Sequence, residues 1–301
     1  MLRRFMGVIP PVSTIFFPDG TLDKQGMGRN IDYLIGQGVH ALFFNGTGGE
    51  FSQMSQSLRR EVAAFVVGYV SGRLPVLIGT GSCSTAEVIE LNDHAKSLGA
   101  DGVVVINPYY WTLSEAHLFA HYDDIAKATD LPIVLYNFPA LTGQDLSPEF
   151  VARLVAKHPH IVGIKDTVDS VNHLNFMIEK VKAVSPDFAV LAGFDNYLMH
   201  TLTMGGDGII AAAGNFLPKL QVDVYNAYVT GDHAQAVRLQ QQLSITTKLH
   251  AIDSPFVNVI KEATKITTGF DFSTYVLPPS RPLSADKIQL VSDILAEVAH
   301  G

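Results

Sequence analysis

The sequence predicts an α/β fold, a (β/α)8 TIM barrel with a C-terminal helical extension. Eight short runs rich in apolar and β-branched residues recur through the first two thirds of the chain. Their starts are spaced by roughly 25–35 residues, which is the size of one strand-plus-helix unit. Helical stretches between them end at a glycine before the next run, as at Gly38 and Gly99, and glycine is the usual left-handed stop of a helix.

The expected strands are bounded by polar or glycine-rich residues. They are residues 7–12, 41–44, 75–78, 102–106, 131–136, 161–165, 188–191 and 208–211. Eight successive strand–helix units favour a closed parallel barrel. An open doubly wound sheet is the rival architecture, but the sequence lacks the glycine-rich nucleotide fingerprint of that fold.

The alternation of strand and helix stops after Asn215. Helical patterns punctuated by Pro218, Gly231 and Pro255 follow it, without a long flexible linker or a low-complexity tract. We therefore expect residues 1–217 to form the barrel and residues 218–301 to form a helical segment packed on it, as a single structural unit.

Composition restricts the class of protein. The 301 residues are 47% hydrophobic and 17% charged, which supplies a large core and argues against disorder. The net charge of −8 and the pI near 5.7 leave no basic footprint for a nucleic-acid partner. The single cysteine, Cys83, excludes an internal disulfide and fits a reducing compartment.

A cytoplasmic location without a membrane partner is expected. No stretch approaches the roughly 20 apolar residues that span a bilayer. The N-terminal residues 1–5 faintly resemble a signal peptide, but Pro10 and Pro11 interrupt the apolar run and no small-residue cleavage site follows.

Lys165 is the most informative of the polar residues that end the expected strands. Strand alternation would put Ile161, Gly163 and Lys165 on the face turned into the barrel, and active sites of barrels lie at these carboxyl ends. Burial disfavours the ammonium and makes the neutral, nucleophilic amine accessible for Schiff-base chemistry on a carbonyl. For this segment alone, pairing with a carboxylate is an equally weighted alternative.

The glycine-rich loop 46–50 follows the second expected strand. Its backbone N–H groups and the Thr47 hydroxyl could bind an anion, and a carboxylate suits it best. It is neither a dinucleotide fingerprint nor a P-loop. A tight turn from strand to helix would explain the same glycines about as well.

Aromatic residues lie near the same end of the expected barrel. Tyr136 closes the fifth strand beside the sixth, where it could relay a proton at a substrate oxygen or only pack and hydrogen-bond. The cluster of Tyr109, Tyr110 and Trp111 could close a neighbouring site or form a subunit contact.

No metal or organic cofactor is expected. His117 and His121 have the i, i+4 spacing of metal ligands on a helix, but no third ligand accompanies them, so solvated histidines are favoured. The signatures of zinc hydrolases, thiol redox proteins and serine hydrolases are absent. A hydrolase therefore has no support.

Three ordered motifs make nearly the whole chain resemble the dihydrodipicolinate synthase/N-acetylneuraminate lyase superfamily of class I aldolases. The motifs are residues 46–50, 136–139 and 163–166. The resemblance implies that Lys165 forms a Schiff base with pyruvate or with the substrate's 2-keto group, and that Tyr136 shuttles protons. It also implies that Thr47 and Gly48 bind the keto-acid carboxylate. Tyr110 would reach toward the adjacent subunit's site in a homotetramer.

Departures from the branches of this superfamily narrow the substrate. The synthase branch has an arginine where this chain has Leu141, so the partner of a second substrate carboxylate is missing. The sialic-acid lyase branch has a glutamate and a serine where this chain has Asn196 and Ala212. Both of those residues contact a long polyol tail, so a shorter substrate is expected.

Within the superfamily the chain is most similar to bacterial 2-keto-3-deoxy sugar-acid aldolases. The resemblance implies reversible cleavage of 2-dehydro-3-deoxy-D-pentonate to pyruvate and glycolaldehyde, so the partners are a small keto acid and an aldehyde. A 2-dehydro-3-deoxy-D-gluconate aldolase, which releases glyceraldehyde, and a sugar-acid dehydratase on the same scaffold are the alternatives. The further substrate-binding candidates are Thr167, Gly193, Asp195 and Asn196.

Overall fold

Eight parallel strands form one sheet, ordered β1-β8-β7-β6-β5-β4-β3-β2, in a computed structural model that describes residues 5–300. The strands are β1 (Gly7–Val8), β2 (Leu42–Phe44), β3 (Val76–Gly79), β4 (Gly102–Ile106), β5 (Ile133–Asn137), β6 (Ile161–Asp166), β7 (Ala189–Ala192) and β8 (Gly208–Ile209). Each overlaps one expected strand. Residues 1–4, considered above for a targeting signal, lie outside the described residues.

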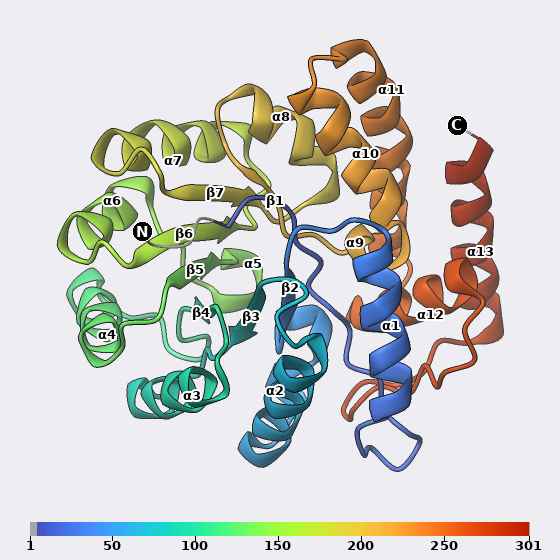
Figure 1. Cartoon of the computed structure of the whole chain (residues 1–301), viewed down its shortest axis with the longest axis horizontal. Helices are drawn as coiled ribbons and strands as arrows, with labels where there is room; N and C mark the ends of the chain where they lie inside the picture. The colour runs from blue at the N-terminus through green and yellow to red at the C-terminus, as the bar shows by residue number, and fades with distance from the viewer. Residues whose placement is uncertain (1–4, 301) are drawn as a thin grey trace.

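Backbone hydrogen bonds between the first segment and β2 close the ring. The Val12 N–H donates to Phe43 O at 2.7 Å, and the Phe43 N–H donates to Pro10 O at 3.1 Å. At its other edge β1 pairs with β8, where Gly7 faces Gly208. The sheet therefore curls into a barrel with helices around it (Figure 1), which confirms the predicted fold class.

Helices cover the outside of the sheet (Figure 1). The longer ones that alternate with strands are α1 (Lys24–Gly36), α2 (Gln56–Val70), α3 (Thr85–Leu98), α4 (Glu115–Ala128), α6 (Pro148–Lys157), α7 (Val171–Val184), α8 (Leu198–Thr203) and α10 (Pro218–Val229). Short helices in the loops are η1 (Thr47–Gly49), η2 (Phe51–Gln53), α5 (Pro139–Thr142), η3 (Asp195–Tyr197) and α9 (Ala213–Phe216). Within residues 5–300, no helix is both long and apolar enough to cross a bilayer.

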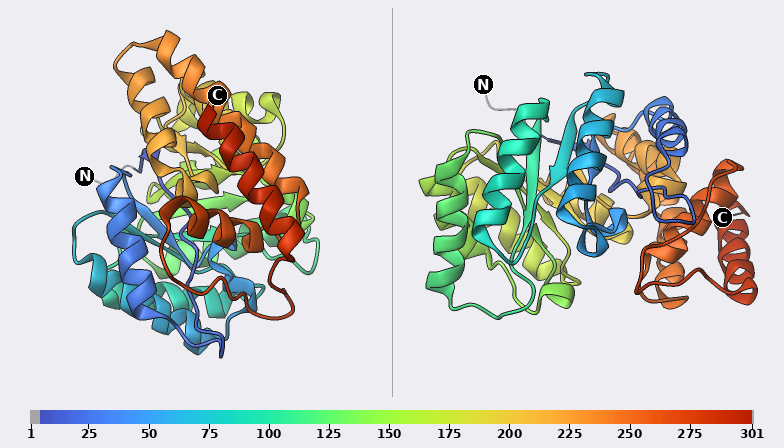
Figure 2. Two further views of the ribbon diagram at one scale, coloured as in Figure 1. Left: turned by 90° about the vertical axis from the view of Figure 1, so that its right-hand side faces the viewer. Right: turned by 90° about the horizontal axis from the view of Figure 1, so that it is seen from below.

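The C-terminal part of the chain lies on one side of the barrel. Its elements are α11 (His233–Ser244), η4 (Ile245–Ala251), α12 (Val257–Thr268) and α13 (Ala285–His300). α13 packs on α12 and η4, far from α4 and α6 (Figures 1 and 2), while α12 reaches η1 and α9. α10 contacts β1 and α8, so the ring of barrel helices continues past residue 217. The division of the chain at that residue stays a prediction.

Local sequence explains where several helices begin and end. The side chains of Ser84, Ser114, Ser147 and Ser170 accept a hydrogen bond from the backbone N–H three residues later. Each satisfies a donor that the first turn of a helix leaves free. At the other end of α3, Gly99 has a φ of +82° and is the left-handed stop that the sequence predicted.

Two apolar cores hold the barrel together. The smaller core fills the barrel interior and includes Phe43, Val104, Val134 and Leu191. The larger core lies between the sheet and the surrounding helices. Side chains alternate between these two cores along a strand. An inward-facing polar side chain at the carboxyl end of a strand therefore lies at the mouth of the barrel.

The predicted alternation along β6 is wrong at its start. Ile161 packs in the outer core and Val162 in the barrel interior. Successive residues of β5 pair with Ile161 and then with Gly163, so β6 contains one extra residue there. Such a bulge reverses the alternation locally. Lys165, beyond the bulge, still faces inward as predicted, with its amine over the ring of Phe43.

Candidate active site

A cavity of about 420 Å³ opens at the carboxyl ends of the strands. The ends of β5, β6 and β7, the loop after β2 and the segment before α12 line it. The predicted residues among its lining are Thr47, Gly48, Tyr136, Lys165, Thr167, Gly193 and Asp195. A second cavity of about 370 Å³, bounded by Asn258, Arg281 and Lys287, contains none of the predicted residues.

Lys165 is buried at the floor of the first cavity, with 4% of its surface exposed. Its Nζ lies 4.0 Å from the ring centroid of Tyr136 and 5.6 Å from that of Phe43. Among the described residues, no carboxylate lies within ion-pair distance of this amine. The alternative in which Lys165 is only a salt-bridge partner is therefore not realised.

Tyr136 joins Lys165 to the glycine-rich loop. It pairs in register with Lys165 across β5 and β6, and its hydroxyl lies 3.1 Å from Thr47 Oγ1. Either hydroxyl can donate in this contact. The two groups form a short path along which a proton can move between the loop and the lysine.

The glycine-rich loop forms η1 and has little room for side chains. A Cβ on Gly48 would lie 3.1 Å from Pro11 O, and one on Gly49 would lie 3.2 Å from Val12 O. Glycines therefore let the loop approach the N-terminal segment closely and leave the Thr47 side chain at the cavity.

A buried ion pair supports this loop from behind. Glu50 pairs with Lys261 of α12, and both side chains are fully buried. Glu50 also accepts a hydrogen bond from the Leu277 N–H at 2.7 Å, and Lys261 donates to Tyr275 O at 2.6 Å. Burial lowers the pKa of Lys261. The sequence did not reveal this pair, because its members are far apart in the chain.

Asp195 also lines the cavity, and its carboxylate is held by residues of α9 and α10. Its carboxylate accepts hydrogen bonds from Gln221 Nε2 at 2.5 Å and from the Ala213 N–H at 3.1 Å. Burial raises the pKa of this carboxyl to about 6. Gln221 lies in α10, and sequence reasoning missed its contribution to the site.

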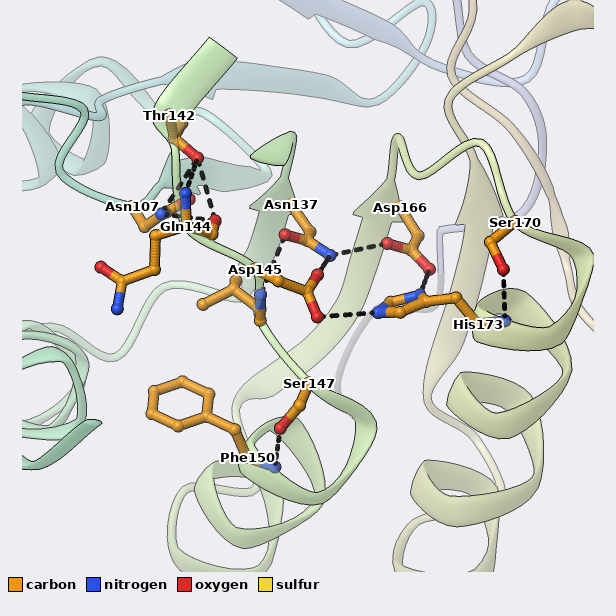
Figure 3. A network of polar contacts seen from close by, with 11 residues as sticks. Asn107, Asn137, Thr142, Gln144, Asp145, Ser147, Phe150, Asp166, Ser170 and His173 are labelled. Carbon is orange, nitrogen blue, oxygen red and sulfur yellow. Dashed lines mark hydrogen bonds and ion pairs between the residues drawn. The ribbon is translucent and has the colours of Figure 1, made fainter. Parts of the chain in front are cut away.

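A polar network joins the ends of β5 and β6 to α7 (Figure 3). Asn137 Nδ2 donates to Asp145 Oδ1 at 2.8 Å and to Asp166 Oδ1 at 2.9 Å. His173 Nδ1 lies 3.0 Å from Asp166 Oδ2, and His173 Nε2 lies 3.2 Å from Asp145 Oδ2. Burial alone would lower the pKa of His173, but the two carboxylates outweigh it and raise the pKa to about 10.

Two predicted site residues do not line the cavity. Asn196 is exposed, because the 3-10 turn η3 directs Asp195 inward and Asn196 toward solvent. Tyr110 is 81% exposed on the loop after β4, where its ring contacts Trp111. Neither residue is brought to the site within this chain.

Two further lining residues lie outside the predicted site set, and the sequence analysis had pointed to only one of them, Leu141. His250 of η4 lines the cavity, and its ring stacks on Phe256 with the centroids 3.8 Å apart. Leu141, which occupies the place of the synthase arginine, lies at the rim and is 57% exposed. The lining here therefore combines apolar Leu141 and Phe256 with the imidazole of His250.

No metal centre is formed within the part of the chain that the structure describes, since no three histidine, cysteine or carboxylate side chains converge there. His117 is exposed. His121 is buried, with Nδ1 2.8 Å from Thr85 Oγ1. Although four residues apart, the two histidines lie in different surroundings.

Comparison with known proteins agrees with this geometry. Residues 4–298 match the model of the dihydrodipicolinate synthetase family. The chain is 50% identical over 294 residues to YagE of Escherichia coli strain K12, covering 98% of this chain and 97% of YagE. It is also 50% identical over 278 residues to YjhH of the same strain, covering 92% of each. Both relatives are named as candidate aldolases, of 2-dehydro-3-deoxy-D-gluconate and 2-dehydro-3-deoxy-D-pentonate respectively.

Solved structures give the same result. The crystal structure of YagE in complex with pyruvate superposes with a TM-score of 0.96 at 49% identity, covering 98% of this chain and 99% of YagE. A dihydrodipicolinate synthase from Thermotoga maritima has a TM-score of 0.93 at 31% identity, covering 99% of each chain. The resemblance that the three motifs predicted is thus confirmed, and the chain is an enzyme that belongs to the dihydrodipicolinate synthetase family.

Proposed function

We propose that this enzyme is a pyruvate-dependent class I aldolase that reversibly cleaves 2-dehydro-3-deoxy-D-pentonate to pyruvate and glycolaldehyde. The observation that carries the proposal is the buried Lys165 amine, free of any ion pair among the described residues and beside the Tyr136–Thr47 hydroxyl pair. A desolvated amine is the nucleophile that Schiff-base chemistry needs, and a hydroxyl relay is suited to proton transfer.

The first step joins the substrate to the enzyme. The substrate carboxylate binds at the loop of Thr47 and Gly48, which places its C2 ketone at Lys165. The neutral amine attacks C2, and Tyr136 gives its hydroxyl proton to the hydroxyl group of the resulting carbinolamine. That group leaves as water, which yields a protonated iminium and a tyrosinate at Tyr136. Positive charge on this nitrogen makes it an electron sink for the adjacent carbon chain.

The second step breaks the carbon chain. Tyr136, coupled to Thr47, accepts the proton of the C4 hydroxyl as the C3–C4 bond breaks. The electron pair of that bond moves into the iminium and forms an enamine, while C4 becomes the carbonyl carbon of glycolaldehyde. Protonation of the enamine at C3 and hydrolysis of the imine release pyruvate and return Lys165 to its starting state.

Two observations support the proposed substrate, namely the names of the similar proteins and the residue at the rim of the cavity. YagE binds pyruvate in its crystal structure, and YjhH is named for the pentonate. Leu141 at the rim offers no cation to a second carboxylate. The name of YagE, at the same 50% identity, supports 2-dehydro-3-deoxy-D-gluconate as the second candidate, with glyceraldehyde as its product.

Borohydride reduction in the presence of pyruvate tests the chemistry. We expect a covalent adduct on Lys165, located by peptide mass spectrometry, and no adduct in Lys165→Arg. Lys182→Arg, which alters a lysine that pairs with Asp207 outside the cavity, is the matched control. An unmodified wild-type Lys165 under these conditions would exclude a class I mechanism.

A coupled assay then separates the candidate substrates. Pyruvate release from five- and six-carbon 2-keto-3-deoxy acids is followed with lactate dehydrogenase, and kcat/KM ranks the two. We expect the pentonate to be preferred. A dehydratase would consume the acid by losing water and would release no pyruvate.

The proposed assembly is a homotetramer in which Tyr110 reaches a neighbouring subunit's site. Support comes from the exposure of Tyr110 at 81% and of Trp111 at 73%, because two adjacent aromatic rings in water are typical of a subunit contact. Sedimentation of the wild-type chain and of Trp111→Ser tests this. A monomeric wild-type enzyme with full activity would contradict it.

A further inference from the structure

We infer that His173 is a positioning residue for the cleavage step, which it serves by holding the strand ends that carry Tyr136 and Lys165 in one fixed relation. This inference rests on the proposed aldolase function and extends it to residues outside the cavity. His173, Asp145 and Asp166 do not line the cavity, so they would not touch a substrate bound there. Their effect must therefore act through the residues they bind.

The register of two neighbouring strands creates the starting geometry. Tyr136 of β5 pairs with Lys165 of β6, and the next residues, Asn137 and Asp166, pair with each other. Side chains alternate along a strand, so the first pair faces the cavity while the second faces outward, toward α7 (Figure 3). Any shift of the outer pair moves the inner pair with it.

Both oxygens of the Asp166 carboxylate are held, and from two different elements. Oδ1 accepts from Asn137 on β5 at 2.9 Å, and Oδ2 lies 3.0 Å from Nδ1 of His173 on α7. The side chain of Asp166 is 1% exposed. Asp166, which directly follows Lys165, is thus bound both to the neighbouring strand β5 and to the outer helix α7.

Asp145 completes a closed cycle of hydrogen bonds. It accepts from Asn137 at 2.8 Å and lies 3.2 Å from His173 Nε2. Asn137 Oδ1 in turn accepts from the Leu146 N–H at 3.0 Å. The order around the cycle is Asn137, Asp166, His173, Asp145 and back to Asn137. A closed cycle resists displacement of either strand end, because each member is held by two neighbours.

Only the charged form of His173 can complete this cycle. A neutral imidazole has one N–H, whereas the imidazolium donates from both nitrogens. The two carboxylates keep the pKa of His173 at about 10, so the residue is charged at neutral pH. Charge-assisted hydrogen bonds of this kind are stronger and more directional than neutral ones.

The structure offers a matched control at the opposite end of the barrel. His158 follows α6, is buried, and lies 2.7 Å from the Asp123 carboxylate. Like His173, it is a histidine beside a carboxylate with little of its side chain exposed. Unlike His173, it lies before the start of β6, at the end of the strand away from Lys165. If His173 only stabilises the fold, replacing His173 and replacing His158 should lower kcat by similar factors.

The experiment compares His173→Leu, His173→Asn and His158→Leu in the full-length enzyme at a temperature where all three are folded. We expect His173→Leu to lower kcat about ten- to hundred-fold, the size of effect caused by misplacing reacting groups by a fraction of an ångström to one ångström. KM should change less than about three-fold, and borohydride trapping of pyruvate on Lys165 should persist. His173→Asn keeps one donor for Asp166 and should recover part of kcat.

The outcomes separate the inference from the proposed function. If wild-type Lys165 fails to trap pyruvate, the aldolase function fails and the inference falls with it. If trapping succeeds but His173→Leu loses no more kcat than His158→Leu, the inference alone is overturned. Should His173→Leu not fold, Asp145→Asn provides the same comparison, with the same lowered kcat expected and an unchanged kcat overturning the inference.

Discussion

The hydroxyl oxygens of Tyr136 and Thr47 lie 3.1 Å apart, although 89 residues separate them in the chain. β5 supplies the first and the loop after β2 supplies the second. Because Tyr136 also packs against the Lys165 amine, this contact connects the expected carboxylate site to the nucleophile. The proposed proton transfer depends on it.

Removing the Tyr136 hydroxyl should therefore impair proton transfer while leaving the nucleophile that binds pyruvate in place. We expect Tyr136→Phe to lower kcat by about 10²- to 10⁴-fold, the usual contribution of a general acid–base group. Borohydride trapping of pyruvate should remain, because the amine is unchanged. Tyr228→Phe, whose ring contacts His233 away from the cavity, is the control. A kcat equal to that of the control would contradict the role of Tyr136.

Because His173 is charged in the folded enzyme, the free energy of unfolding should decrease as pH rises into the alkaline range. The pKa is raised from 6.5 in the unfolded chain to about 10 in the folded enzyme. The stabilisation is therefore fully present below pH 6.5 and is lost as pH rises toward 10. We expect urea unfolding at fixed protein concentration to show that His173→Asn costs about 1–2 kcal/mol at pH 6, after allowance for solvent screening, and less at pH 10. An equal cost at both pH values would contradict the charged state.

The buried pair of Glu50 and Lys261 should be costly to break from one side. Lys261→Met leaves the Glu50 charge buried without its partner, and about 3–5 kcal/mol of the free energy of unfolding should be lost. The double variant Lys261→Met with Glu50→Gln removes both charges and keeps an acceptor for the Leu277 N–H, so it should lose less. Denaturant unfolding measures both. A double variant as unstable as the single one would argue against an electrostatic cause.

Because Asp195 is buried, its ionisation should decrease the free energy of unfolding as pH rises from acidic to neutral values. Its pKa is raised from 3.8 to about 6 by burial. A group with a raised pKa contributes stability below its unfolded pKa and loses it as pH rises through the folded value. We expect Asp195→Asn to gain about 2 kcal/mol relative to wild type between pH 4 and pH 7.5. Asp93→Asn, on the exposed face of α3, should show no such trend in the same urea series.

Three of the predicted site residues line one cavity because they lie at strand ends. Thr47, Tyr136 and Lys165 each follow or close an apolar run, and barrel closure brings such ends to one mouth. Asn196 was misplaced because a single 3-10 turn decides which of two neighbouring side chains points inward. The face of Ile161 was wrong because the bulge in β6 depends on pairing with β5.

The sequence by itself determined the barrel and the order of its strands, because periodicity is a local property of the chain. It also placed Lys165, Tyr136 and Thr47 at strand ends, and the resemblance of their motifs to a known family led to the proposed Schiff-base chemistry. Tertiary structure alone decided which distant side chains support that chemistry. The links from His173 to Asp145 and from Glu50 to Lys261 join residues that no local pattern relates. They form only after the ring has closed, when water is excluded and each buried charge must find its partner.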